Sequence, residues 1–390
     1  LRRNTITFCV YIVSLQSLFL KTASTEATDI NVLDLSAKYG HPATSYDVTT
    51  EDGYILQLFH IPGNKRPVLL INGLADTADT WLIRGNGSLA IFLASAGYDV
   101  WLGNYRGNRY GRRHTHLDPD NDSSFWNFSF HEHGVYDLPA MIDTILEKTG
   151  SDKIDAIGHS QGNTIFYVLG STRPEYNDKV NLMIALGPVG YLHNVVPPLS
   201  VILSVYPKLN QILGSLNVHE LFNSKRLPEY ILKTVCSIPH IGFTLCVDKL
   251  LFKITGSDPE EFGPDYFKII NNYFPSSISR KNIDHFSQVF NRQKFTRYDY
   301  GHRNEAVYNS KEPPDYNLRN VTMKVAFIVG LNDKLTPFKD INNLRSQLPN
   351  LVNYTVGPRE KFNHIDFVWG ENMDVYLFPL IFDLLKTYKR

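Results

Sequence analysis

The sequence predicts an α/β fold: a mostly parallel sheet with flanking helices and one mainly helical insertion. Short apolar runs that end in glycine, such as PVLLING (67–73), are typical of buried parallel strands. Segments with helical periodicity, such as DLPAMIDTILEKTG (137–150), alternate with these runs. The alternation stops at residue 188 and returns near residue 318, so the segment between is predicted to be an insertion.

The first part of the sheet is expected before residue 188. The segment SYDVTTEDGYILQLFHI (45–61) predicts a hairpin, because its alternation is centred on the turn pair Asp52 and Gly53. Further buried strands are predicted at 67–73, 98–104, 153–158 and 181–187. The helix at 137–150 is expected to end at Gly150 and to pack through Leu138, Met141, Ile142, Ile145 and Leu146.

The rest of the sheet follows the insertion. MKVAFIVG (323–330) and VNYTV (352–356) are predicted strands, and a helix is expected between them near 339–347. A final helix presents one apolar face made of Leu377, Leu380, Ile381, Leu384 and Leu385. The predicted organisation is a signal peptide (1–24), a first core part (30–187), a cap and lid insertion (188–318) and a second core part (319–390).

The amino terminus has the pattern of an export signal. Arg2 and Arg3 precede the apolar stretch FCVYIVSLQSLFL, and small residues follow it near 24–27. The stretch is too short to cross a bilayer comfortably, and a short amphipathic helix is the alternative interpretation. The sequence therefore predicts a protein that is secreted or enters the lysosomal lumen. Lys and Arg number 39 and Asp and Glu number 39, a balance that does not favour nucleic acid or a polybasic membrane anchor.

Two further features agree with export. Cys236 and Cys246 remain after signal removal, and such a pair in a secreted chain indicates one local disulfide, with two buried free thiols as the alternative. Candidate N-glycosylation sites occur in Asn-X-Ser/Thr triplets at Asn86, Asn121, Asn127, Asn320 and Asn353.

Residues 158–162, GHSQG, predict a nucleophilic serine. In a nucleophile elbow, a strand turns sharply into a helix and holds the serine at the apex in a strained conformation. Gly158 and Gly162 leave room for that turn, while His159 and Gln161 flank Ser160. A predicted strand precedes the motif and a predicted helix follows it. This context favours the elbow over an ordinary loop serine.

A serine needs a base to take its proton and an acid to orient that base. In hydrolases with this elbow the chain order is Ser, acid, His, and the acid and histidine follow late strands. Asp333 and His364 follow the last two predicted strands, so they are the expected partners. Asp340 is at a helix start, where it stabilises the helix, and Asp366 follows His364 too closely to orient it.

The tetrahedral intermediate of acyl transfer needs two hydrogen-bond donors for its oxyanion. The template predicts the backbone N–H of Gln161, directly after the nucleophile, and that of Leu74 in the loop after an early strand. His114 with His116 and His131 with His133 resemble metal-binding pairs, but neither pair has a third ligand at a recognisable spacing. No metal or organic cofactor is expected.

The sequence resembles the acid lipases, the family that contains gastric lipase and lysosomal acid lipase. The resemblance extends over nearly the whole chain after the export signal and rests on TEDGYIL, NGLADTADTW, LASAGYDVWLGNYRGNRYGRRH, FWNFSFHEHGVYDLPAMID, IGHSQGN, ALGPVG, NLRNVT and FNHIDFVWG.

The resemblance implies an α/β-hydrolase core with a cap and lid inserted before the acid. It also implies hydrolysis of neutral lipid esters, such as triacylglycerol or cholesteryl esters, at a lipid–water interface. It carries the triad onto Ser160, Asp333 and His364, the oxyanion donors onto Leu74 and Gln161, and the family's cap disulfide onto the cysteine pair.

One motif departs from the family pattern. The family usually has His-Gly-Leu in the oxyanion loop, and this chain has Asn72-Gly73-Leu74. The donor is a backbone N–H, so the change affects the shape of the loop rather than the donor itself. Two other functions stay open: an esterase acting on shorter or other lipid esters, and a lipid-binding protein without turnover.

Overall fold

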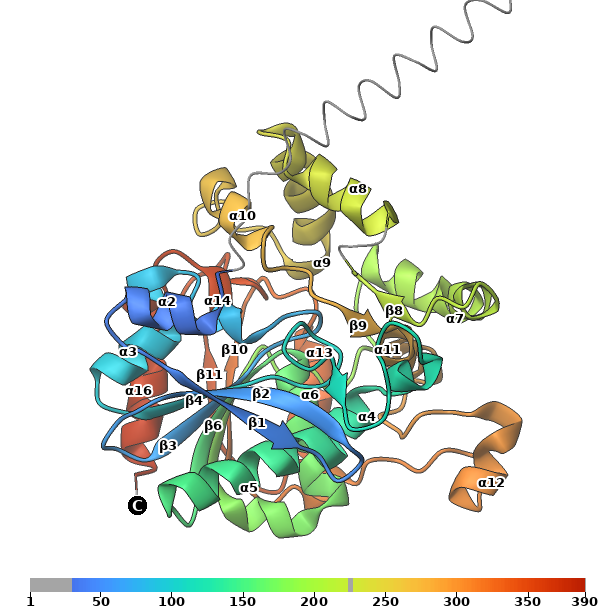
Figure 1. The fold of residues 1–390 in the computed structure, drawn as a ribbon, viewed down its shortest axis with the longest axis horizontal. Coiled ribbons are helices and arrows are strands. Elements are labelled where there is room, and N and C mark those ends of the chain that lie inside the picture. The colour runs from blue at the N-terminus through green and yellow to red at the C-terminus, as the bar shows by residue number, and fades with distance from the viewer. Residues whose placement is uncertain (1–29, 224–226, 390) are drawn as a thin grey trace, which may run out of the picture.

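A single mixed sheet with helices on both faces forms the core of the molecule (Figure 1). The computed structural model describes residues 30–223 and 227–389, so the predicted signal peptide (1–24) lies outside the described residues. The strand order is β1-β2-β4-β3-β6-β7-β10-β11, and β5 pairs with β2. Strands β1, β2 and β4 pair antiparallel, and all pairs from β4–β3 to β10–β11 are parallel. The predicted fold class is confirmed.

All strands of this sheet except the two-residue β5, which was not predicted, agree with the sequence-based predictions to within a few residues. They are β1 (Thr44–Thr49), β2 (Tyr54–Ile61), β3 (Pro67–Ile71), β4 (Asp99–Gly103), β5 (Arg113–His114), β6 (Ile154–His159), β7 (Val180–Leu186), β10 (Val325–Val329) and β11 (Leu351–Val356).

Side-chain alternation along each strand divides the core into two layers. In β3, Val68 and Leu70 pack into one layer, and Leu69 and Ile71 pack into the other. One layer is covered by α2 (Val32–Lys38), α3 (Leu89–Ser95) and α16 (Phe378–Thr387), and the other by α5 (Leu138–Thr149), α6 (Gln161–Thr172) and α13 (Phe338–Gln347). Because both faces are covered, the central strands β3, β7 and β10 are buried at every position and mostly apolar.

The helix predicted at 137–150 begins earlier than its sequence suggests. Helical structure starts at α4 (Phe130–Glu132) and passes through a π-helical turn, η4 (His133–Asp137), into α5. Ser129 caps the start together with Glu132. Pro139 lacks a backbone N–H and is therefore usually found in the first turn of a helix. Here the π-helical turn η4 precedes it, so helical structure continues on its N-terminal side.

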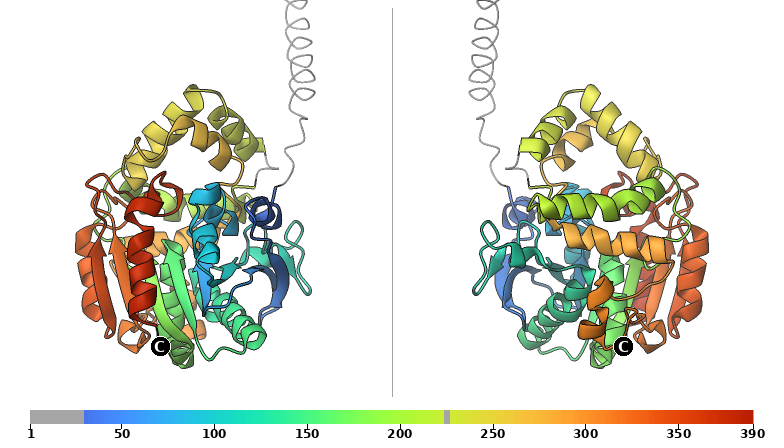
Figure 2. Two further views of the ribbon diagram at one scale, coloured as in Figure 1. Left: turned by 90° about the vertical axis from the view of Figure 1, so that its left-hand side faces the viewer. Right: turned by 90° about the vertical axis from the view of Figure 1, so that its right-hand side faces the viewer.

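The chain between β7 and β10 is mainly helical. Helices α8, α9 and α10 lie above one end of the sheet, and α7 packs along α11 (Figures 1 and 2). The elements are α7 (Leu199–Ser215), β8 (Glu220–Leu221), α8 (Leu227–Cys236), the π-helix η6 (Phe243–Leu251), α9 (Phe252–Thr255), α10 (Pro264–Ile270), β9 (Ile278–Ser279), α11 (Arg280–Arg292) and α12 (Asn304–Tyr308). The predicted boundaries of the insertion and of the two core parts stay predictions.

Short elements complete the chain. They are α14 (Asp366–Trp369), α15 (Met373–Tyr376) and the 3₁₀ turns η1 (Ala78–Trp81), η2 (Gly85–Gly87), η3 (Ser123–Trp126), η5 (Pro174–Lys179), η7 (Gly301–Arg303) and η8 (Leu318–Asn320). Over the described ranges, no helix is both long and apolar enough to cross a membrane.

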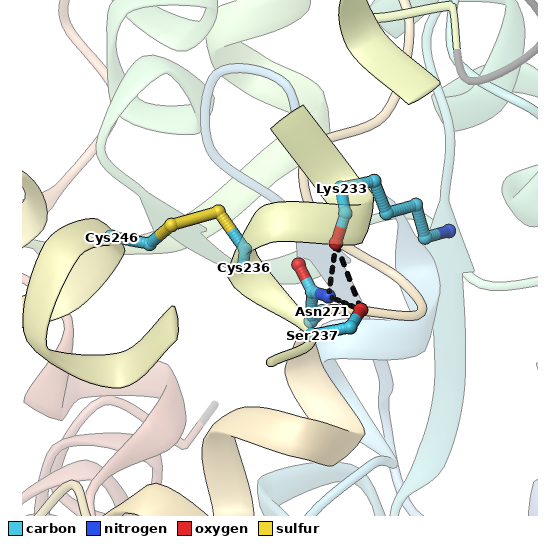
Figure 3. The surroundings of a disulfide bond; sticks show 5 residues. All are labelled: Lys233, Cys236, Ser237, Cys246 and Asn271. Carbon is cyan, nitrogen blue, oxygen red and sulfur yellow. Dashed lines mark hydrogen bonds between the residues drawn. A yellow bond between two sulfur atoms is a disulfide. The ribbon is translucent and has the colours of Figure 1, made fainter. Parts of the chain in front are cut away.

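A disulfide joins two helices of the insertion. Cys236 at the end of α8 is bonded to Cys246 in η6, as the sequence suggested (Figure 3). Beside it, the Asn271 side chain donates to Ser237 Oγ at 2.8 Å and to the Lys233 carbonyl at 3.3 Å (Figure 3). These bonds tie α8 to the end of α10, so the three helices are linked into one unit.

Candidate active site

The residues predicted for catalysis follow the carboxyl ends of parallel strands. Ser160 follows β6, Asp333 follows β10 and His364 lies in the loop after β11. Leu74 follows β3, the neighbour of β6 in the sheet. The carboxyl ends of parallel strands meet at one edge, where loops from separate strands converge on a site. The fold therefore brings the predicted residues to the same end of the sheet.

Ser160 has the strained backbone of a nucleophile elbow. Its φ is 54° and its ψ is −119°, a conformation that L-residues rarely adopt, and it is the N-cap of α6. A Cβ on Gly158 would lie 2.7 Å from Asn163 Oδ1, and one on Gly162 would lie 2.5 Å from the Ile71 carbonyl oxygen. Both glycines are therefore required by close packing, as the motif predicted.

Asp333 is bonded to His364. The Nδ1–H of His364 donates to Asp333 Oδ2 at 2.7 Å, while Asp333 Oδ1 accepts from the N–H groups of Leu335 at 2.9 Å and Thr336 at 3.0 Å. Burial raises the pKa of Asp333, but the charge and hydrogen bond of His364 oppose it, and the net result is a lowered pKa. A charged Asp333 holds the proton on Nδ1, which leaves Nε2 of His364 free to act as a base.

Ser160 and His364 both lie at the carboxyl end of β7, and no hydrogen bond joins them. Nε2 of His364 is buried and has no hydrogen-bond partner in the part of the chain that the structure describes. The Ser160 N–H donates to the Leu186 carbonyl at 3.1 Å, and a Cβ on the next residue, Gly187, would lie 3.1 Å from His364 Nδ1 and 3.2 Å from Asp333 Oδ2. Catalytic hydrogen bonds are often long before substrate binds. The predicted base and the predicted nucleophile therefore meet the same strand end, at neighbouring residues of the chain.

The oxyanion loop runs alongside the nucleophile. A Cβ on Gly73 would lie 3.2 Å from Ser160 Cβ. The Gly73 carbonyl accepts from the Tyr105 hydroxyl and, at 3.3 Å, from Asn72 Nδ2. Because C=O and N–H point in opposite directions in a trans peptide, these bonds turn the Leu74 N–H away from Tyr105. Asn72, the residue that departs from the family pattern, therefore helps to hold the peptide that carries the predicted donor.

The second predicted donor lies at the start of α6. Gln161 is the first residue of that helix, where backbone N–H groups have no acceptor within the helix. Its side chain is buried, and Gln161 Oε1 accepts from Asn282 Nδ2 of α11 at 2.7 Å. This contact joins the elbow to the insertion.

His159 is a residue whose role sequence reasoning missed. Its Nε2–H donates to the backbone carbonyl of His364 at 2.9 Å, and burial lowers its pKa to about 3. The ring is therefore neutral. Its hydrogen bond connects the end of β6 to the loop that contains His364. The motif GHSQG shows a histidine here, but its contact lies 205 positions away in sequence and cannot be read from the motif.

The competing carboxylates are engaged elsewhere. Asp340, in the first turn of α13, accepts from the backbone N–H of Asn194 at 2.9 Å and from its side chain at 2.7 Å. Asp366 accepts from the Asn363 N–H at 2.9 Å. Asp340 thus connects α13 to the segment after β7, and Asp366 stabilises its own loop, while Asp333 is the carboxylate bonded to the histidine.

The histidine pairs have structural contacts. His131 is bonded to the Tyr316 hydroxyl at 2.9 Å, His133 stacks on Tyr105 with ring centroids 4.5 Å apart, and His114 is bonded to the Asp52 carbonyl at 2.9 Å. No group of three or more His, Cys, Asp or Glu among residues 30–223 and 227–389 could hold a metal ion.

The predicted glycosylation sites lie on the surface. Asn86, Asn121, Asn127 and Asn320 are exposed, and Asn353 on the edge strand β11 is partly exposed. Their use as glycan acceptors stays a prediction.

Comparisons with known proteins agree with the fold. Residues 66–212 match the model of the alpha/beta hydrolase fold, and residues 32–85 match that of the partial alpha/beta-hydrolase lipase region. A thermophilic esterase from Thermogutta terrifontis has a similar fold, with a TM-score of 0.54 at 13% identity, over 89% of this chain and 100% of that chain.

Sequence relatives are closer and extend over most of the chain. Lipase 1 of Drosophila melanogaster is 39% identical over 91% of this chain and 80% of its own length. Human lysosomal acid lipase/cholesteryl ester hydrolase is 34% identical over 94% of each chain, and human gastric triacylglycerol lipase is 33% identical over 95% of this chain and 94% of its own. The resemblance inferred from the motifs is confirmed: the chain belongs to the acid lipase family and is a serine ester hydrolase with the α/β-hydrolase fold.

Proposed function

We propose that this protein is a lipase that hydrolyses ester bonds of neutral lipids through Ser160, His364 and Asp333. The observation that carries the proposal is the buried His364–Asp333 hydrogen bond of 2.7 Å, at the same end of the sheet as a serine held in a strained elbow. The names of the relatives, which include a triacylglycerol lipase and a cholesteryl ester hydrolase, support triacylglycerol or cholesteryl esters as the substrate class.

The reaction follows from the positions of these groups. Ser160 Oγ attacks the ester carbonyl carbon while its proton moves to His364 Nε2. The N–H groups of Leu74 and Gln161 stabilise the oxyanion, and His364 then protonates the departing alcohol as the C–O bond breaks. Water attacks the acyl-enzyme, His364 takes its proton, and the fatty acid leaves. Asp333 orients His364 and stabilises its charged form throughout.

The surface of the insertion supports a lipid substrate. Most of the large apolar side chains that are exposed in the described chain belong to it. On α7 they recur every three or four residues and form a stripe along one side of the helix: Val201, Val205, Leu209, Ile212 and Leu216. An exposed apolar stripe of this kind is typical of a surface that contacts a partner or a lipid phase. The insertion would thus hold the protein at the lipid–water interface where its substrate resides.

Export to an oxidising compartment is part of the proposal. The Cys236–Cys246 disulfide and the exposed sequons both agree with a secreted or lysosomal protein. The names of the gastric and lysosomal relatives support the same two destinations.

The test is release of fatty acid from emulsified trioleoylglycerol, from about pH 4 to about pH 8, by the wild type and by Ser160→Ala. Release by the wild type alone is expected. If the wild type cleaves short soluble esters but not the emulsion, the esterase alternative replaces the lipase. If it cleaves neither, the protein is a lipid-binding member of the family without turnover.

A further inference from the structure

A short segment of the insertion runs between the two loops that carry Asp333 and His364. We call residues 255–258, which begin at the last residue of α9, the strap. The His364 N–H donates to the Thr255 carbonyl at 3.1 Å, and Asn332 Nδ2 donates to the Ser257 carbonyl at 3.0 Å. The insertion therefore accepts one hydrogen bond from the predicted base and one from the neighbour of the predicted acid.

Gly256 lies at the centre of the strap, where no side chain fits. Its φ is 98°, in the region that favours glycine. A Cβ would lie 2.0 Å from the Asn332 carbonyl oxygen and 2.9 Å from Asn363 Cβ. The backbone of the Asp333 loop and a side chain of the His364 loop therefore both contact Gly256 at the position that a Cβ would occupy. The strap packs against both loops, which are also bonded to each other through the Asn332 N–H and the Phe362 carbonyl at 2.9 Å.

Both ends of the strap are fixed. Thr255 Oγ1 donates to the Leu251 carbonyl at 2.9 Å, within the helical segment that precedes the strap. At the other end, the buried carboxylate of Asp258 accepts from Arg359 Nη2 at 2.9 Å. Arg359 belongs to the same loop as His364, between β11 and α14. The strap is therefore a rigid connection and not a loosely packed linker.

We propose that the strap, through Gly256, positions the acid and the histidine for catalysis. This inference rests on the proposed function. The strap helps to hold the two loops at the separation at which His364 Nδ1 reaches Asp333 Oδ2. A misplacement of about 1 Å at a reacting centre can lower the rate by about 10²-fold. Gly256 is a positioning residue, because it acts through its neighbours and has no role in binding the acyl chain.

The inference predicts different substrate requirements for the strap and for the rest of the insertion. A surface that only binds lipid is dispensable for a short soluble ester. A segment that positions the triad is needed for every ester. We therefore expect strap variants to lose activity on p-nitrophenyl butyrate as well as on emulsified lipid.

The main test compares Gly256→Ala with Gly263→Ala. Gly263 belongs to the same insertion, has a φ of −98°, and a Cβ there would meet nothing within 4 Å. For Gly256→Ala we expect kcat on p-nitrophenyl butyrate to fall by about 10²-fold with KM nearly unchanged. For Gly263→Ala both constants should stay at the wild-type values.

A second variant keeps the test decisive if Gly256→Ala does not fold. Asn332→Ser removes the side-chain donor that Asn332 shares between the Ser257 carbonyl at 3.0 Å and the Lys361 carbonyl at 3.2 Å, at a partly exposed position. It is expected to lower kcat by about 10-fold and to shift or broaden the low-field proton resonance of His364 Nδ1–H. A residue with a merely structural role would leave that resonance unchanged in folded protein.

The outcomes distinguish the inference from the proposed function. Wild-type protein without activity would overturn the proposed function, and the inference with it. Wild-type activity together with unchanged kcat in Asn332→Ser, or in folded Gly256→Ala, would overturn the inference alone.

Discussion

Asp366 is a buried carboxyl group whose own contribution to the free energy of unfolding should be larger in acid than at neutral pH. Its side chain is fully buried, and it shares its surroundings with the buried carboxylates of Asp258 and Glu261. Burial raises its pKa from 3.8 to about 8; the two carboxylates add to this effect, while the Asn363 N–H and Arg359 oppose it. Asp366 therefore holds a proton in the folded state at acidic and neutral pH.

The sign and size of the effect follow from linkage. Between about pH 4 and pH 8 the folded state binds this proton and the unfolded state does not, so the free energy of unfolding falls as pH rises. Each pH unit in that window changes it by about 1.4 kcal/mol. From pH 5 to pH 8, the contribution of Asp366 thus decreases by about 4 kcal/mol.

Asp366→Asn isolates this contribution. The amide oxygen can still accept from the Asn363 N–H, which donates to Asp366 Oδ2 at 2.9 Å, but the side chain no longer titrates. We expect the free energy of unfolding, measured in urea, to rise in the variant relative to the wild type by about 4 kcal/mol between pH 5 and pH 8. Asp374→Asn, at an exposed position of α15, is the control. A difference between Asp366→Asn and wild type that stays constant over this range would refute the reasoning.

Three further predictions concern single contacts. Asp333→Asn should lower kcat on a soluble ester by about 10⁴-fold, because an amide no longer fixes the proton on Nδ1 of His364; unchanged kcat would contradict this. Tyr105→Phe removes a hydrogen bond that holds the oxyanion loop, so kcat should fall by up to about 10²-fold at nearly constant KM, and a change confined to KM would contradict it. Replacing Cys236 and Cys246 by serine opens a loop with a sequence separation of 10 and should lower the free energy of unfolding by about 2–3 kcal/mol in urea titrations; equal midpoints would speak against it.

Features that depend on local sequence could be predicted. The strands that precede Ser160 and Asp333 are short, mostly apolar runs, and the structure has them within two residues of the predicted bounds. Gly158 and Gly162 identified the elbow because steric crowding at that turn is a local property. The order of serine, acid and histidine along the chain then limited the candidates for the remaining two residues.

Features that depend on distant contacts could not be predicted. The brace from His159 to the His364 carbonyl and the packing of Gly256 against Asn332 join segments that only the fold brings together. The early start of the helix at Phe130 was missed for a different reason: a proline that usually marks a first turn is accommodated by a π-helical turn. The first two features depend on tertiary contacts, and the third depends on a local backbone geometry that the residue pattern does not indicate.

The most direct test of the account is to locate the nucleophile by covalent labelling. A p-nitrophenyl phosphonate reacts with an activated serine and releases p-nitrophenol, leaving a stable adduct on the side-chain oxygen. Intact-mass and peptide analysis should show one adduct on the peptide that contains Ser160, no adduct in Ser160→Ala, and much slower labelling in His364→Ala. An adduct on another residue, or labelling at the same rate without His364, would contradict the proposed triad.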